Sequence, residues 1–446
     1  MKKLIVTILF IFLFSIFLFA EDNPNNQNNS SLFSDDLFTE GFKFIGQYKN
    51  YISYQKQNDF VINYNNDGTP HTENYILSDL KRIRLSPEIK YGNMFVFHLD
   101  YDNELIMTNF NRSPYFNLMF RPSTYNEFSM LTWDVYSGDS IFYRHKIHRA
   151  YMKLSINSFT FTIGRQQIRF GSAIMWNPLD IFNPISPVAI EGAEEQASTD
   201  ALRINYYLND QTEIALIINP KRYKDNFDKI KCNTFNFAAR FKTTINLKNI
   251  KNKNFGSTDL ALLVAYAAKR KIIATDFSTV LFKGLLKGSV LHADSEGSSS
   301  FLQSSIGFDR SFKNSMRIAF EYFYNQDAVL HNDSLMQSYN TLYNNGITSD
   351  NYYPLANRII TMNHHFGGLL WSYELSSLFI GSILIMYEFA NNGLMVTPSV
   401  NYSYSDNVTC FIGSIFSGVF SKNKRRSDFY EYHGKSLVWM GLKLFF

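Results

Sequence analysis

The sequence predicts an all-β protein, a transmembrane antiparallel β-barrel of about 16 strands, within a range of about 14 to 18, that follows a cleaved signal peptide. Three observations lead to this prediction. The N-terminus carries an apolar export-type segment, period-two alternation recurs along the chain, and the last segment alternates up to an aromatic terminal residue. A chain of 446 residues is long enough for one large barrel.

The composition is rich in strand-forming aromatic residues and poor in charge. Aromatic residues make up 17% of the chain and charged residues 18%, with 42 Phe and 28 Tyr. The mean hydropathy of −0.18 argues against a bundle of membrane helices. It suits strands with one apolar and one polar face, although a large soluble β-protein would show the same composition.

The N-terminus has the pattern of a secretory signal. Lys2 and Lys3 precede an almost unbroken apolar run over residues 4–19, and Ala20 is the small residue before the expected cut. We expect residues 1–20 to be a signal peptide, 21–40 a flexible periplasmic lead and 41–446 the outer-membrane barrel. An uncleaved anchor helix is the alternative.

The net charge argues against nucleic acid as a partner. The full chain has 43 basic and 39 acidic residues, so the chain without Lys2 and Lys3 has 41 basic residues and a net charge of +2. Such a near balance does not attract a polyanion through bulk charge.

Period-two alternation recurs through the rest of the chain. In residues 316–324, apolar side chains at even positions alternate with Arg317, Ala319 and Glu321. This dyad pattern is the signature of strands that face lipid on one side and a wet lumen on the other. Further segments with the pattern are 94–101, 150–156, 202–208 and 235–242.

The connections between these segments are of two kinds. Short turns are predicted at 157–158, 209–211, 391–393 and 405–407, and longer polar segments at 56–78, 102–127, 170–198, 326–362 and 420–435. Counting strands back from 436–446 places 326–362 and 420–435 outside the cell. Counting from a periplasmic turn at 157–158 places 170–198 outside, but between 220 and 312 the two counts differ by one strand.

The C-terminus alternates up to the last residue. Val438, Met440, Leu442, Leu444 and Phe446 are apolar at every second position. This arrangement resembles the C-terminal signal of outer-membrane barrels, with Phe446 as the residue that the barrel-assembly machinery reads. It implies a location in the outer membrane of a Gram-negative (diderm) bacterium.

The polar strand faces supply the candidate pore lining. Basic residues outnumber acidic ones on these faces, and rings of Arg or Lys in a pore favour anions. The alternative is that basic and acidic groups pair across the lumen and only hold the structure. The candidates are Arg82, Arg84, Lys90, Arg149, Lys153, Arg165, Arg169, Arg203, Arg240, Lys242, Arg317 and Glu321.

The segment 159–170 changes phase. Ile163 belongs to its apolar face, and an unbroken alternation would then direct Arg165 and Arg169 into lipid. A β-bulge at Gly164 would turn both arginines into the lumen. Alternatively, they lie above the membrane.

The following segment, 171–198, is predicted to fold into the barrel as a constriction loop, with its acidic residues facing lumen arginines. It combines apolar side chains and rigid Asn-Pro turns with a charge cluster. The alternative is a surface loop that packs on itself. Its candidate residues are Trp176, Asn177, Pro178, Asn183, Pro184, Glu191, Glu194 and Glu195.

A family resemblance rests on this same region. Residues 164–167 (Gly-Arg-Gln-Gln), Phe170-Gly171, 176–178 (Trp-Asn-Pro) and Asn183-Pro184 resemble a signature of bacterial porin-like barrels related to the alginate-export group. Residues 321–325 are similar to a strand end in these barrels, whereas Phe170 stands where they often have Trp. The resemblance implies a porin or exporter barrel of this size and leaves the solute open.

No residue pattern predicts catalysis, a metal or a cofactor. His364 and His365 are adjacent, so on a strand they point to opposite faces. The sequence predicts a channel for passive passage of small hydrophilic solutes, with a weak anion preference. The alternatives are a surface-exposed structural or adhesive barrel, a polysaccharide exporter and a barrel enzyme. Expected partners are outer-membrane lipid, the assembly machinery and small solutes, in an oligomeric state left open.

Overall fold

The structure is a computed structural model of the chain. It describes residues 41–64, 69–113, 116, 128–182, 198–224, 230–246, 255–268, 270–295, 299–328 and 359–446. Residues Lys43–Phe446 form one compact unit, to which the account below refers. The predicted signal peptide (1–20) and the predicted lead (21–40) lie outside the described residues.

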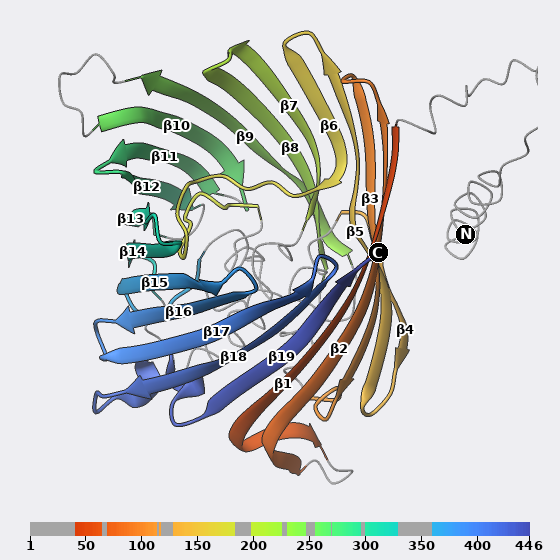
Figure 1. The fold of residues 1–446 in the computed structure, drawn as a ribbon, viewed down its shortest axis with the longest axis vertical. Helices are drawn as coiled ribbons and strands as arrows, with labels where there is room; N and C mark the ends of the chain where they lie inside the picture. Colours follow the sequence, from red (N-terminus) through yellow and green to blue (C-terminus); the bar gives the residue numbers. More distant parts are fainter. Residues whose placement is uncertain are drawn as a thin grey trace, which may run out of the picture. The chain divides into compact units, whose positions relative to one another are not determined.

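Strands account for nearly all of the regular structure in the described residues (Figure 1). The first nine are β1 (Phe42–Tyr64), β2 (Pro70–Tyr91), β3 (Phe95–Thr108), β4 (Thr132–Ser137), β5 (Ile141–Ile156), β6 (Phe159–Gln166), β7 (Thr199–Asn209), β8 (Thr212–Lys224) and β9 (Ile230–Asn246). The others are β10 (Phe255–Ala267), β11 (Arg270–Leu281), β12 (Gly284–Ser295), β13 (Phe301–Ser311), β14 (Met316–Asn325), β15 (His365–Ser376), β16 (Phe379–Glu388), β17 (Gly393–Ser405), β18 (Val408–Val419) and β19 (Ser436–Phe445). Two short 3-10 turns, η4 (Lys424–Arg426) and η5 (Tyr430–Tyr432), precede β19.

The sheet is a closed antiparallel barrel of 18 strand positions. β1 pairs with β19 and so joins the first strand to the last. β4 adds no position of its own, because it pairs with residues 142–146 of β5 while β6 pairs with residues 150–156 of the same strand. The predicted all-β barrel is therefore confirmed, and its 18 strand positions lie at the upper end of the predicted range of about 14 to 18, two above the central estimate of about 16.

The missed strands explain the discrepancy between 220 and 312. The structure has five complete strands within that interval, β9 to β13, and β10 and β11 are separated only by Ala268 and residue 269. The connection between these two strands begins at Ala268, which has a φ of +53°. It contains no Gly or Pro, so the sequence gives no signal of a turn there.

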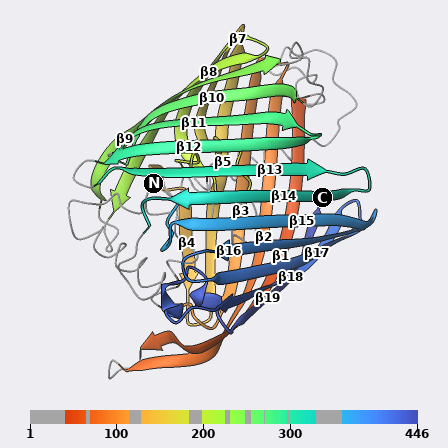
Figure 2. The same cartoon turned by 90° about the vertical axis from the view of Figure 1, so that its left-hand side faces the viewer.

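Two of the predicted polar segments, 56–78 and 102–127, are in part strands. Residues 56–64 and 70–78 extend the β1–β2 hairpin, and residues 102–108 continue β3. Figure 2 shows the far end of the β1–β2 hairpin beyond its neighbours, which agrees with the β1–β19 register ending at Gln55. The polarity of 102–108 comes from inward-facing acids and not from a loop.

The two faces of the wall differ in the way that the alternation predicted. Met152, Phe237 and Phe320 are each about half exposed on the outer face, whereas Asp102 and Phe323 are fully buried on the inner face. In the described residues no helix is long and apolar enough to cross a membrane.

The predicted bulge at Gly164 was wrong. The registers of β6 with β5 and with β7 both run through Gly164 without a shift. Gly164 has a φ of +121° and a Cβ there would overlap the carbonyl oxygen of Ala150, which explains the glycine without a change of face.

The barrel closes at the chain end. The Phe446 amide donates to the Gly46 carbonyl at 2.9 Å, and the Gly46 amide donates to the Phe446 carbonyl at 2.7 Å. The Phe446 ring lies over Gly46, where any Cβ would overlap it. The absence of a side chain at Gly46 therefore leaves room for the Phe446 ring at the seam, the junction of β1 and β19 that closes the barrel.

Candidate functional site

The segment 167–182 leaves the wall and lies inside the barrel. β6 stops at Gln166, paired with Thr199, and the chain then crosses the enclosed space toward β14, as the yellow segment in Figure 1 shows. Gly171 permits the sharp change of direction with a φ of +83°. The Asn177 side-chain amide donates to the Phe170 carbonyl and closes the bend.

Glu321 on β14 anchors the tip of this segment. Its carboxylate accepts the backbone amides of Ile174 at 2.7 Å, Met175 at 3.1 Å and Trp176 at 2.6 Å. Gly368 on the neighbouring strand leaves room for the Met175 sulfur, because a Cβ there would overlap it. A buried carboxylate that accepts three amides fixes the backbone of the tip.

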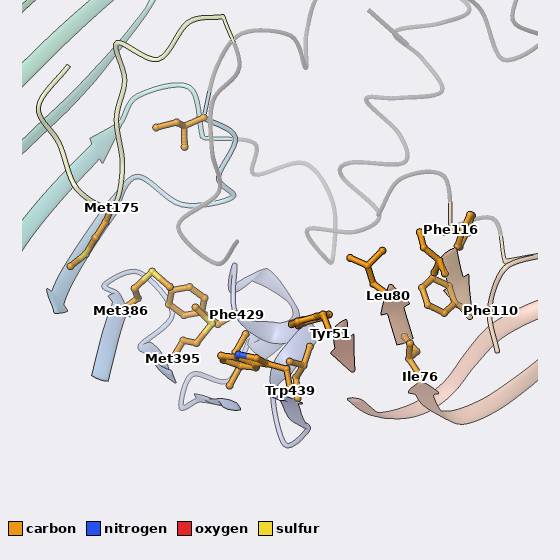
Figure 3. Packing of buried hydrophobic residues seen from close by; sticks show 14 of the residues in the cluster. Tyr51, Ile76, Leu80, Phe110, Phe116, Met175, Met386, Met395, Phe429 and Trp439 are labelled. Atoms are coloured by element: carbon orange, nitrogen blue, oxygen red, sulfur yellow. The ribbon is translucent and has the colours of Figure 1, made fainter. Parts of the chain in front are cut away.

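Trp176 completes the anchor with its ring. The indole stacks on Phe323, with ring centroids 5.8 Å apart and planes 7° apart, and contacts Phe366 at 5.7 Å. Trp176 is 3% exposed. Figure 3 shows Met175 in the same apolar cluster as Met386, whose side chain lies beside Phe429.

The rest of the segment packs against small side chains on the inner wall. Its buried residues are Ile168, Phe170, Leu179, Ile181 and Phe182. The small side chains leave space for the segment, so the residues of the facing strands determine where the segment lies. The wall residues are Ala201, Ala215, Ile217, Ala238, Leu263, Ala265, Ala267, Ile272, Ala274, Leu291, Ala293 and Phe301.

A ladder of buried ion pairs covers the inner face of β2, β3 and β5. Arg84 binds Asp102 through two nitrogens at 2.6 and 2.7 Å, and Arg82 Nε donates to Glu104 at 2.6 Å. Arg144 donates to the other oxygen of Glu104. The charges of Arg82 and Arg84, both predicted to line the pore, are thus largely neutralised within the wall.

Other predicted lining residues are also paired. Arg240 lies 3.3 Å from Glu213 and over the Phe170 ring at 5.2 Å. Three more basic residues form ion pairs with carboxylates, measured from nitrogen to oxygen: Lys242 with Asp259 at 3.2 Å, Arg317 with Asp309 at 2.7 Å and Lys90 with Glu88 at 2.9 Å. At these positions the basic and acidic groups pair with one another, as the alternative to an anion-selective lining predicted.

A basic pocket remains where β5, β6 and β7 meet the internal segment. It is a recess of ≈ 350 Å³ with no acidic residue in its lining. Lys153 and Arg203 make no ion pair within the described residues, and Arg203 Nε donates to Asn205 at 2.8 Å. Arg149 donates to Gln167 at 2.9 Å and lies 3.7 Å from Asp100. The lining is Arg149, Tyr151, Lys153, Thr160, Thr162, Gln166, Gln167, Arg203, Asn205 and Tyr207.

Arg165 and Arg169 do not join this pocket. Arg165 is 2% exposed, keeps the register of Ile163 and binds Asp200 at 3.1 Å. Its guanidinium also donates to the Ser129 carbonyl at 2.7 Å, so it joins β6 and β7 to the segment before β4. Arg169 is exposed on the internal segment.

Of the predicted constriction residues, Trp176, Asn177 and Pro178 lie buried in the internal segment. The others fall outside the described residues, and these are Asn183, Pro184, Glu191, Glu194 and Glu195. Within the part of the chain that the structure describes, no group of three or more His, Cys, Asp or Glu could hold a metal ion.

The sequence prediction missed the acidic half of the ladder. Asp102 and Glu104 were assigned to a loop, although they continue the alternation of residues 94–101 by two further periods. A longer window over β3 would have placed both acids opposite the arginines of β2.

This fold defines a class, the porin-like β-barrels. No protein-family profile matches the chain, and no curated protein sequence matches it. Among solved structures, OccAB4 of Acinetobacter baumannii is similar with a TM-score of 0.50 and 9% identity, over 91% of this chain and 99% of that chain. OccAB1 of Acinetobacter baumannii (0.49, 8%, 90% and 96%) and OccD3 (OpdP) of Pseudomonas aeruginosa (0.48, 7%, 91% and 91%) are also similar. At such identities the likeness shows the fold alone.

Proposed function

We propose that the protein is an outer-membrane channel for passive passage of small hydrophilic solutes, with a preference for anions. The basic pocket carries this proposal. Lys153 and Arg203 form no ion pair with a described residue, in a wall where most other described inward charges are paired. A cation that is not neutralised, beside a low-dielectric wall, attracts anions into the lumen.

The internal segment supports the same function. It is held at its tip by Glu321 and along its length by the alanine-rich wall, and it borders the pocket at Gln167. A solute that crosses the barrel must pass beside this segment. It therefore acts as the constriction.

The proposal also covers the membrane, the assembly machinery and the family relation. The half-exposed apolar outer face fits outer-membrane lipid, and the terminal Phe446 on its seam fits recognition by the barrel-assembly machinery. The relation to the alginate-export group is supported only by the motif residues between 164 and 184 and by residues 321–325. We propose no enzymatic role.

Planar-bilayer recording of the purified, folded chain tests the function. We expect stepwise conductance and, in a KCl gradient, a reversal potential on the anion-selective side. Folded protein, verified by heat-modifiable migration in gels, that gives no conductance steps would contradict the channel. It would favour the alternative of a closed structural barrel, which the apolar clusters on the inner side of the wall also fit.

A further inference from the structure

Two buried carboxylates meet where β16 ends. Glu388 is the last residue of β16 and is 0% exposed, and Asp428 lies between η4 and η5 and is 8% exposed. Neither forms an ion pair with a described residue. Placing two unpaired carboxylates together in a buried site carries a large free-energy penalty unless a proton or a cation joins them.

The protein satisfies three of the four carboxylate oxygens. Asp428 accepts the Met362 amide at 2.8 Å on Oδ1 and the Asn363 side-chain amide at 3.0 Å on Oδ2. Glu388 Oε1 accepts the Asn391 backbone amide at 2.8 Å. Glu388 Oε2 is buried and has no hydrogen-bond partner.

The unpartnered oxygen is directed toward the loop that carries Asp428. A Cβ built on Gly393 would lie 3.0 Å from Glu388 Oε2 and 2.5 Å from Ser427 Oγ, so both oxygens face the side of Gly393 that has no side chain. Alanine at this position would press on both oxygens.

The nearby amide donors are already used. The side-chain nitrogens of Asn363 and Asn391 donate to the Arg426 carbonyl at 2.8 and 2.9 Å, and Asn391 also donates to Asn363 Oδ1 at 3.1 Å. Around the carboxylates the site thus offers carbonyl, amide and hydroxyl oxygens. Hard oxygen donors with carboxylates are the ligands that Ca²⁺ takes, in flexible geometry.

We propose that a divalent cation of the Ca²⁺ type binds between Glu388 and Asp428, with Ser427 Oγ and Asn363 Oδ1 as neutral donors. The cation ties three segments together: the end of β16, residues 359–363 and residues 424–428. It thereby fixes the loop between β18 and β19 against the wall, whether or not the barrel conducts.

Binding of the cation should depend on pH. Burial, assisted by the charge of Glu388, raises the pKa of Asp428 to about 7. A bound cation removes that penalty, so binding below neutral pH releases a proton.

The test is calcium binding to the full folded chain in detergent, measured by flow dialysis with CaCl₂ alone. We expect one ion per chain, with a Kd on the order of 0.1–1 mM as in extracellular oxygen-ligand sites. Glu388→Gln and Asp428→Asn keep the size of each side chain and should each weaken binding at least about tenfold. Asp406→Asn, in the exposed β17–β18 turn, is the matched control and should bind as the parent does.

A second readout guards against variants that fold poorly. Calcium should raise the thermal midpoint of the parent and of Asp406→Asn by several degrees and leave both site variants unchanged. Saturating calcium that binds neither parent nor variants, or that binds all four chains equally, overturns the site. If the carboxylates share a proton instead, calcium has no effect and Asp428→Asn alone raises the midpoint, which also overturns it.

Discussion

Glu321 and Trp176, 145 positions apart in the sequence, are joined by a 2.6 Å hydrogen bond from the Trp176 amide to the Glu321 carboxylate. This contact fixes the internal segment across the barrel. The sequence alone predicted that both residues face the lumen but not that they meet, because alternation determines faces and not partners.

Replacing Glu321 with Gln should loosen the internal segment. The amide leaves one oxygen to accept from three backbone amides, and loss of the charge-assisted bonds weakens the anchor by about 3 kcal/mol. We expect noisier single-channel currents and a red-shifted Trp fluorescence. Glu374→Gln, at an exposed position on β15, is the control. Unchanged current noise in Glu321→Gln would show that the anchor does not limit motion of the segment.

Neutralising the basic pocket should reduce anion preference. In the double variant Lys153→Gln and Arg203→Gln, the ratio of anion to cation permeability should fall roughly two- to tenfold, because the pocket loses two positive charges that form no ion pair with a described residue. Reversal potentials in a KCl gradient measure the ratio. Lys283→Gln, in the exposed turn after β11, should leave the ratio unchanged. A ratio that is equal in all three chains means that other residues set selectivity.

The ion-pair ladder should contribute to stability only as intact pairs. Asp102→Asn leaves Arg84 buried without its charge partner and should lower the free energy of unfolding by about 3–5 kcal/mol. The apolar double variant Arg84→Met with Asp102→Leu should recover most of this loss. Urea unfolding in lipid vesicles measures both.

The control for the ladder is the pair formed by Lys90 and Glu88. Lys90 has a side chain that is 55% exposed, so Lys90→Gln should have little measurable effect. A double variant no more stable than Asp102→Asn alone would contradict the assignment of the loss to an unpaired charge.

Much of the wall could be predicted from the sequence, because strand alternation is a local property. The outward faces of Met152 and Phe320 and the position of the last strand were predicted correctly. The strand number was not, because the turn at Ala268 has no sequence signal. The network around Glu388 and Asp428 was also missed, since it joins residues 40 positions apart through loops with no periodicity.

The loop between β18 and β19 should lose stability as the pH rises. The pKa of Asp428 is about 7 in the folded loop, against 3.8 for an ordinary Asp, so the folded state binds the extra proton. The stabilisation is complete below about pH 4 and is lost as the pH rises to about 7, at up to about 1.4 kcal/mol per pH unit. Groups facing Asp428 are Glu388, the Met362 amide and Asn363.

Limited trypsin cleavage after the exposed residues Lys424, Arg425 and Arg426 reports this loss. Expressed relative to cleavage at the exposed Lys283, the rate in EDTA should increase between about pH 5 and 7 in the parent chain and level off above about pH 7. Asp428→Asn, which stays neutral, should give a flat ratio, and added calcium should suppress the increase in the parent. A ratio that rises equally in the parent and in Asp428→Asn would assign the pH dependence to another group.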